Sequence, residues 1–213
     1  MLVQVLSLIA LAAQAITAAL AAGRRNMDWV GVCTLGFVAA LGGGSLRDVL
    51  LGHYPLSWVR EPYLLGLTAG AALATTFLSH VVKRMAELFL WIDAVGLVLF
   101  TISGCESALL GGATPTISVV AGLITGCFGG VLRDVLCNEI PLIFRSELYA
   151  GVSILTGTIY VVGRHLYPGA SAVTLGAATV GLACRMLAIR YRWQVPTFRY
   201  SDDPPGSGGP RRD

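Results

Sequence analysis

Charged residues are scarce in this sequence of 213 residues, where only 13% are Asp, Glu, Lys or Arg. Soluble domains usually carry about 25%. Here 55% of the residues are hydrophobic, and the mean hydropathy is +0.72. The composition excludes an ordinary soluble domain and predicts an all-α integral membrane protein. The net charge of +3 is too small to indicate a nucleic-acid partner, so we expect none.

Cysteine and histidine are also few, and neither shows a spacing typical of a chemical site. None of the five cysteines forms a C-x-x-C pair, which favours small buried side chains over disulfides or metal ligands. The three histidines lie far apart in the sequence. No nucleophile with a base, no metal-ligand spacing and no cofactor loop is present. We therefore expect neither an enzyme nor a bound cofactor or metal.

What the sequence does have is long apolar runs, and seven of them predict transmembrane helices. They run approximately over Leu2–Ala22, Trp29–Leu51, Pro62–His80, Leu88–Leu110, Thr116–Leu136, Leu148–Val162 and Ala170–Ile189. The first run lacks a preceding basic segment, and its roughly 21 residues span about 30 Å as a helix. We expect a first transmembrane helix there rather than a removable signal peptide.

The chain contains an internal repeat with an offset of 86 residues. The segment Gly43–Leu50 recurs as Gly129–Leu136 with seven of eight positions identical. The match continues without a gap between Gly36–Leu65 and Gly122–Gly151, where twelve of thirty positions are identical. The offset contains three predicted spans, and because three is odd, the second copy must enter the membrane from the opposite side. The sequence thus predicts two inverted three-helix repeats plus a seventh helix.

Domain limits follow from this repeat and from a change in composition. We expect the first repeat over residues 1–82, the second over 83–168 and the seventh helix over 169–193. Residues 194–213 are rich in Pro, Gly, Ser and charge, which predicts a disordered cytoplasmic tail. If the N-terminus is outside, inner segments hold eleven Lys and Arg, and outer segments hold two, Arg60 and Arg164. This asymmetry predicts an N-terminus outside and a C-terminus in the cytoplasm.

The second and fifth predicted helices combine glycine with charge. Three tandem glycines, Gly42 to Gly44, cost about 1 kcal/mol each relative to alanine in a helix, which favours a kink or an unwound turn. The fifth helix contains Gly122, Gly126, Gly129 and Gly130. The four-residue spacing of Gly122, Gly126 and Gly130 also suits close helix packing, so both interpretations stay open for them.

Each of these two helices also carries an Arg-Asp pair, Arg47-Asp48 and Arg133-Asp134. An ionised side chain at the bilayer centre costs about 2.5–3.5 kcal/mol, so all four must face protein or water. Adjacent residues do not face each other on a helix. We therefore expect pairing across the pseudo-two-fold axis, Arg47 with Asp134 and Arg133 with Asp48. Such pairs would clamp two helices together or border a pore, and the two roles are compatible.

Further polar residues are candidates for a pore lining. Asp93 and Glu106 both lie in the fourth predicted helix. The first predicted helix has Ser7 and Leu20 at the equivalent positions, so the two halves differ there. Ser45 and Thr125 lie beside the glycine clusters, although hydroxyls in membrane helices often bond their own backbone.

The twin motif resembles the prokaryotic members of the trimeric intracellular cation (TRIC) channel family. The resemblance rests on the pattern G-G-G-x-x-R-D-x-L-L-G-x-x-P at Gly42 to Pro55, its second copy at Gly129 to Pro141, and D-A-V-G at Asp93 to Gly96, and it covers about residues 1–190. It implies a seven-helix protomer with inverted repeats, a homotrimer, and one pore per protomer beside the kinked second and fifth helices. Family members commonly open the first helix with an acid and a glycine, whereas this chain has Ser7 to Ala10 there.

The resemblance also implies an activity, the passage of monovalent cations, chiefly potassium, through a prokaryotic inner membrane. The candidate pore and hinge residues are Gly42, Gly43, Gly44, Ser45, Arg47, Asp48, Thr125, Gly126, Gly129, Gly130, Arg133 and Asp134, with Asp93 and Glu106 as possible polar lining. The alternative is a secondary transporter or facilitator for a small amino acid such as glycine, because inverted repeats and broken helices are equally typical of transporters. Besides the ions, we expect membrane lipids as partners.

Overall fold

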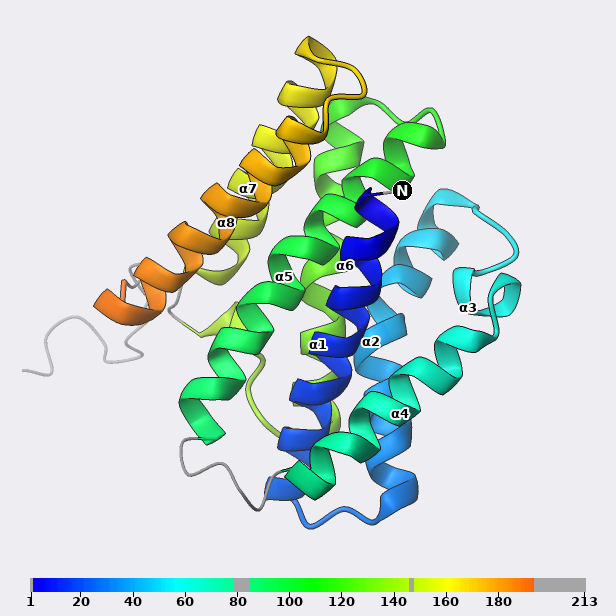
Figure 1. Ribbon diagram of the computed structural model, residues 1–213, viewed down its shortest axis with the longest axis vertical. Coiled ribbons are helices and arrows are strands. Elements are labelled where there is room, and N and C mark those ends of the chain that lie inside the picture. Colours follow the sequence, from blue (N-terminus) through cyan, green and yellow to red (C-terminus); the bar gives the residue numbers. More distant parts are fainter. Residues whose placement is uncertain (1, 79–84, 146–147, 194–213) are drawn as a thin grey trace, which may run out of the picture.

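The computed structural model describes residues 2–78, 85–145 and 148–193, and all the regular secondary structure in these ranges is helical. Figure 1 shows the elements in order along the chain. They are α1 (Leu2–Arg24), α2 (Trp29–Leu51), α3 (Ser57–Arg60), α4 (Tyr63–Leu78), α5 (Met85–Leu110), α6 (Pro115–Leu136), η1 (Leu142–Phe144), α7 (Tyr149–Leu166) and α8 (Ser171–Tyr191). The predicted tail and the predicted boundary between residues 82 and 83 lie outside the described residues.

The seven long helices each overlap one predicted apolar span. In the described ranges, five of them, α1, α2, α5, α6 and α8, are long and apolar enough to cross a membrane. The helix α4 is apolar but shorter. These lengths confirm the prediction of an all-α integral membrane protein.

The bounds of the helices recur at the same 86-residue offset as the sequence motif. The helix α2 begins at Trp29 and α6 at Pro115, while α4 begins at Tyr63 and α7 at Tyr149. The residues that follow α2 and α6 also correspond, because Gly52 (φ 69°) and Asn138 (φ 53°) both adopt the left-handed conformation. Gly and Asn are the residues that tolerate it at a helix end. In Figure 1, α2 ascends and α6 descends.

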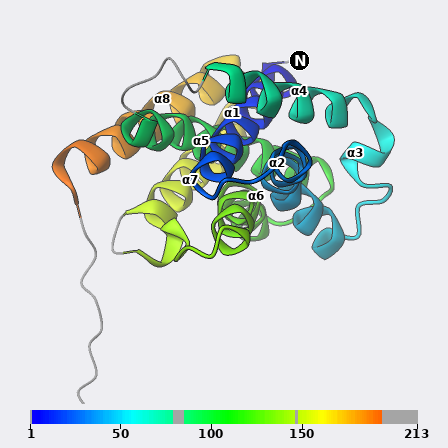
Figure 2. The same cartoon turned by 90° about the horizontal axis from the view of Figure 1, so that it is seen from below.

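Four helices form the centre of the bundle. The helices α1, α2, α5 and α6 pack against one another, α4 covers α1 and α2, and α7 and α8 cover the α5 side. Figure 2 shows this arrangement from below, with α4 and α8 towards the periphery. The central position of α2 and α6 places their glycines and charges inside protein rather than against lipid.

The glycines of α2 and α6 allow two backbones to approach closely. A Cβ atom at Gly43 would lie 2.5 Å from the carbonyl oxygen of Thr125, and one at Gly129 would overlap that of Ala39. Both helices are continuous through these positions. The unwound turn predicted at Gly42 to Gly44 is therefore wrong, because helix–helix contact offsets the low helix propensity of glycine.

The second glycine face of α6 packs against α5. A Cβ atom at Gly122 would lie 2.7 Å from the carbonyl oxygen of Thr101, and one at Gly126 would lie 2.8 Å from that of Leu97. The packing interpretation of the four-residue glycine spacing is confirmed for these two positions.

Neighbouring glycines on α2 provide a matched test of this packing. Gly43→Ala should destabilise the protein by about 1–3 kcal/mol, because its methyl group would meet backbone atoms that cannot rotate away. Gly44→Ala should leave stability unchanged or raise it by up to about 1 kcal/mol, because the nearest atom to its Cβ is Arg47 Nη2 at 3.9 Å. Thermal unfolding in detergent measures both variants, and equal effects at the two positions would contradict the packing account.

Candidate functional site

Each Arg-Asp pair is closed within its own helix and anchors the short helix that follows. In the first half, Arg47 donates through Nε (2.9 Å) and Nη2 (2.6 Å) to Asp48 Oδ1. Asp48 Oδ2 accepts from the hydroxyl of Ser57, the first residue of α3 (2.9 Å). In the second half, Arg133 Nε donates to Asp134 Oδ1 (2.8 Å). Asp134 Oδ2 accepts from the backbone N–H of Leu142, the first residue of η1 (3.0 Å).

The predicted pairing across the pseudo-two-fold axis is wrong. The helices α2 and α6 are antiparallel and cross near Gly43 and Gly129, and each Arg-Asp pair lies beyond the crossing towards the C-terminal end of its helix. The two pairs therefore lie on opposite sides of the crossing. Moreover, the Cβ atoms of adjacent residues point in different directions on a helix. The long arginine side chain can still fold back along its own helix, so its guanidinium group reaches the carboxylate of the next residue.

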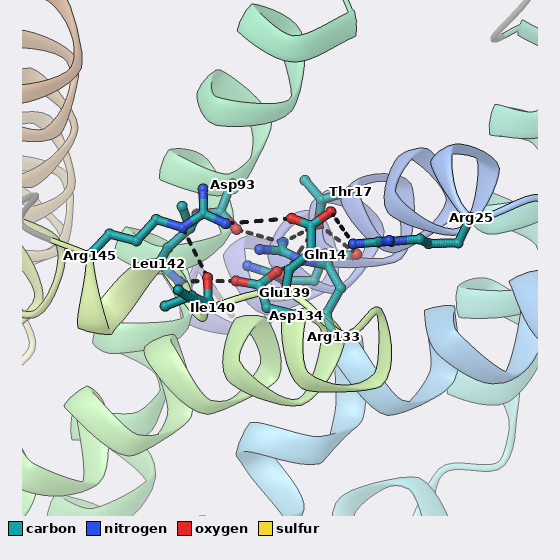
Figure 3. A network of polar contacts seen from close by, with 10 residues as sticks. All are labelled: Gln14, Thr17, Arg25, Asp93, Arg133, Asp134, Glu139, Ile140, Leu142 and Arg145. Atoms are coloured by element: carbon teal, nitrogen blue, oxygen red, sulfur yellow. Dashed lines mark hydrogen bonds and ion pairs between the residues drawn. The ribbon is translucent and has the colours of Figure 1, made fainter.

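The second pair is part of a larger buried cluster. Arg133 is fully buried, and its Nη1 donates to Asp93 Oδ1 (2.7 Å) and to the hydroxyl of Thr17 (3.0 Å). Figure 3 shows Asp93 of α5, Thr17 of α1 and Asp134 of α6 converging on this guanidinium group. Its Cζ atom also lies 4.5 Å from the centroid of the Phe89 ring. One cation thus binds two carboxylates in a site closed to solvent, where such hydrogen bonds are strongest.

Asp93 was a candidate for the pore lining, and the structure places it elsewhere. Its side chain is fully buried in the ion pair with Arg133. Its second oxygen, together with Arg133 Nη2, Gln14 Nε2 and the Tyr149 hydroxyl, finds no hydrogen-bond partner among the described residues. A buried polar atom without a partner costs about 1–3 kcal/mol. The cluster is therefore buried within the protein and has further capacity for hydrogen bonds.

The first pair lies beside a large cavity, which we call the vestibule. It has a volume of about 900 Å³ and is enclosed by the N-terminal half of α1, the C-terminal turns of α2 and α5, the short α3, and parts of α7 and α8. The predicted site residues in its wall are Gly44, Ser45, Arg47, Glu106 and Thr125. The remaining predicted residues do not line it; these are Gly42, Gly43, Asp48, Asp93, Gly126, Gly129, Gly130, Arg133 and Asp134.

Glu106 in the vestibule wall is paired rather than free. Its carboxylate accepts hydrogen bonds from Arg164 Nη2 (3.0 Å) and Nε (3.2 Å) and from the hydroxyl of Tyr160 (2.8 Å). Sequence reasoning assigned Arg164 to an outer loop, and no motif pointed to this pair. The vestibule wall therefore contains the ion pair of Arg164 with Glu106, and Arg47 of the wall is paired with Asp48 behind it.

A smaller cavity lies at the opposite end of the bundle, and we call it the Asp134 pocket. It has a volume of about 180 Å³ and is lined by Arg24, Phe89, Leu90, Asp134, Glu139, Leu142 and Arg145. The ring of Phe89 lies between two guanidinium groups, with its centroid 4.9 Å from Arg24 Cζ and 4.5 Å from Arg133 Cζ. The ring thus contacts Arg133 of the buried cluster as well as Arg24 of this pocket. The residue equivalent to Phe89 in the first half is Val3, so the internal repeat did not point to Phe89 as a site residue.

Known membrane proteins are similar to this chain over nearly its whole length. The family model described as Glycine transporter matches residues 4–80 and again residues 90–165. The UPF0126 inner membrane protein YadS of Escherichia coli is 38% identical over 206 residues, which are 95% of this chain and 99% of YadS. The UPF0126 membrane protein YvgT of Bacillus subtilis is 31% identical over 202 residues, 94% of this chain and 98% of YvgT.

Solved structures show the same fold. The TRIC channel orthologue from Rhodobacter sphaeroides is 34% identical with a TM-score of 0.87, over 90% of this chain and 98% of that one. A prokaryotic TRIC channel in 0.5 M KCl is 30% identical with a TM-score of 0.85, over 92% and 99%. A TRIC channel from C. elegans, 12% identical with a TM-score of 0.60 over 84% and 89%, shares the fold alone.

The fold and the buried charges define an all-helical integral membrane protein with the TRIC architecture. More particularly, the chain belongs to the UPF0126 family of membrane proteins, which is the bacterial TRIC family and the one whose model is described as Glycine transporter.

The buried cluster makes a quantitative prediction. Arg133→Gln should destabilise the protein by about 3–5 kcal/mol, because it leaves the carboxylates of Asp93 and Asp134 buried without a counter-charge. The double variant Arg133→Gln with Asp93→Asn should recover part of this loss. Arg164→Gln, which breaks the pair with Glu106 whose side chains are 24% and 17% exposed, is the matched control and should cost less, about 1 kcal/mol. Unfolding titrations in mixed detergent measure all three, and an equal cost for the two arginines would refute the account.

Proposed function

We propose that this protein is a potassium-permeable, monovalent cation channel of the prokaryotic inner membrane, with one pore per protomer of a homotrimer. The observation that carries the proposal is the vestibule, which reaches Gly44 and Thr125 beside the crossing of α2 and α6. The TRIC channels similar to this chain are cation channels by name, and YadS is an inner membrane protein. Both points support the proposal.

The proposed topology has seven spans in two inverted repeats plus α8, with the N-terminus outside. The two matches to the family model support two repeats, because they begin 86 residues apart, at residues 4 and 90. The opposite directions of α2 and α6 support their inversion. The excess of Lys and Arg in the inner segments supports the orientation. The vestibule then opens to the outside, and the Asp134 pocket faces the cytoplasm.

The proposed pore runs from the vestibule past the α2–α6 crossing to the Asp134 pocket. Two groups close it in the present conformation, the Arg133 guanidinium and the Phe89 ring that stacks on it. At the crossing, Gly43 and Gly129 bring the two backbones together, and the Leu132 side chain of α6 packs on Gly42 of α2. A small slide or bend of α6 against α2 at these glycines would open a path by moving Leu132, Arg133 and Phe89 aside. The polar atoms of the buried cluster that have no protein partner would then bind water.

Selectivity for cations is compatible with the arginines in this path. Arg47 and Arg164 are each held by a carboxylate, so the vestibule wall carries paired charges. Past the crossing, Arg133 meets the carboxylates of Asp93 and Asp134, so its positive charge is balanced there. Hydroxyls such as those of Thr125 and Ser45, with helix carbonyls, would replace part of the hydration shell of the ion.

A second candidate function is a facilitator for a small amino acid such as glycine. Two observations favour it, namely the description of the family model and the volume of the vestibule, about 900 Å³, which is far larger than a potassium ion needs. Transporters also place broken or closely crossing helices around a central site. The difference between the two functions is kinetic.

Recording from purified protein in planar bilayers under a KCl gradient tests the channel directly. We expect unitary current steps and a reversal potential that follows the potassium equilibrium potential. The facilitator would instead give saturable glycine uptake and counterflow in proteoliposomes without unitary currents, and that result would replace the channel proposal with the second candidate.

The proposed closing role of Phe89 makes a separate prediction. Phe89→Ala should raise the open probability several-fold, because Arg133 would lose the ring that contacts it beside the Asp134 pocket. Phe128→Ala on α6 removes the same side chain at a partly exposed position and should leave gating unchanged. Single-channel open probability is the measurement, and identical values for wild type and Phe89→Ala would exclude this residue as the closing group.

A further inference from the structure

The two halves of the molecule use their equivalent arginines differently. In the second half, Arg133 Nη1 binds the carboxylate of Asp93 and the hydroxyl of Thr17. The residues at the 86-residue offset in the first half are Ser7 for Asp93 and Ser103 for Thr17. Their two hydroxyls bond each other (2.8 Å) instead of the arginine. The first half therefore has the arginine and the hydroxyls of this arrangement but lacks the second carboxylate.

Arg47 consequently keeps a donor that faces the vestibule. The residue is 6% exposed, and its Nε and Nη2 both bind Asp48. Its Nη1 makes no hydrogen bond with any residue that the structure describes. Arg47, Ser7 and Ser103 all line the vestibule. Next to them the cavity reaches the backbone, because a Cβ atom at Gly44 would have only Arg47 Nη2 within 4 Å.

We infer that the vestibule contains a binding site for a small carboxylate, such as acetate or the carboxylate of glycine. The ligand's carboxylate would take, toward Arg47, the place that the Asp93 side chain takes toward Arg133. Arg47 Nη1 would donate one charge-assisted hydrogen bond, and the hydroxyl of Ser103, which accepts from Ser7, would donate a second. The guanidinium group is preorganised for this, because the bond to Asp48 already fixes its plane.

The charge balance supports this ligand class. Arg133 in the second half forms ion pairs with two carboxylates, whereas Arg47 in the first half forms one, with Asp48. A bound carboxylate would give Arg47 the second carboxylate partner that Arg133 has in Asp93. An amino group is not required at Arg47, so simple carboxylates and amino acids share the site. The inference goes beyond the proposed channel and does not rest on its conductance.

The test measures carboxylate binding to the purified full-length protein in detergent. Each ligand, [13C]acetate, [13C]glycine or [13C]methylammonium, is added in place of an equal amount of potassium chloride, so that the ionic strength stays constant. Saturation-transfer NMR reports whether the ligand binds. Wild type should bind acetate and glycine but not methylammonium. Ser7→Asp should weaken acetate binding by at least about tenfold, because its own carboxylate would occupy Arg47 as Asp93 occupies Arg133. Gln4→Glu, which adds the same charge to the vestibule wall one turn away, should bind acetate like wild type.

Two results would overturn the inference. One is acetate binding by Ser7→Asp that equals wild type, and the other is the absence of acetate binding to wild type. If Ser7→Asp does not fold, Arg47→Lys decides the question, since it keeps the charge beside Asp48 but loses the free Nη1. It should also weaken acetate binding by at least about tenfold, and wild-type affinity would refute the site. Failure of the channel would leave these binding results unchanged, so the two proposals can fail separately.

Discussion

The structure depends on how four ionised side chains are accommodated inside an apolar bundle. An arginine or aspartate in this position is tolerated only when its charge is paired within the protein. Asp134 meets this condition with Arg133 on one oxygen and the start of η1 on the other, and Asp48 does so with Arg47 and the start of α3. The ion pairs thus fix the turns that follow α2 and α6.

The same constraint explains the close contact between α2 and α6. Charged side chains near the ends of these helices stay inside protein only if both helices occupy the centre of the bundle. Gly43 and Gly129 allow this, because a Cβ atom at either position would overlap the backbone of the other helix. Glycine is often a weak point in a helix, yet here the loss of propensity is offset by packing that no other residue permits. The glycines and the ion pairs are therefore parts of one arrangement.

Hydropathy and the internal repeat predicted most of the fold. The apolar runs located the seven long helices of the described residues, and the offset of 86 residues recurs where α2 and α6 begin and at Gly52 and Asn138 after them. The details of the site were less accessible. The rule that adjacent residues on a helix do not face each other excluded the pair Arg47-Asp48. This rule describes the directions of the Cβ atoms and not the reach of a long arginine side chain. The burial of Asp93 depends on packing among α1, α5 and α6, and Phe89 belongs to no motif, so sequence reasoning had no means to find either contact.

The asymmetry between the halves is the central claim of this account. Two equivalent arginines lie in different surroundings, Arg133 in a closed cluster and Arg47 beside the vestibule. Thr17 and Ser103 are equivalent residues in these two places, and the measurement compares Thr17→Cys with Ser103→Cys after replacement of the five native cysteines. With a water-soluble methanethiosulfonate reagent in detergent, where both faces are accessible, the cysteine at position 103 should react at least about tenfold faster. Equal rates at the two positions would contradict the account.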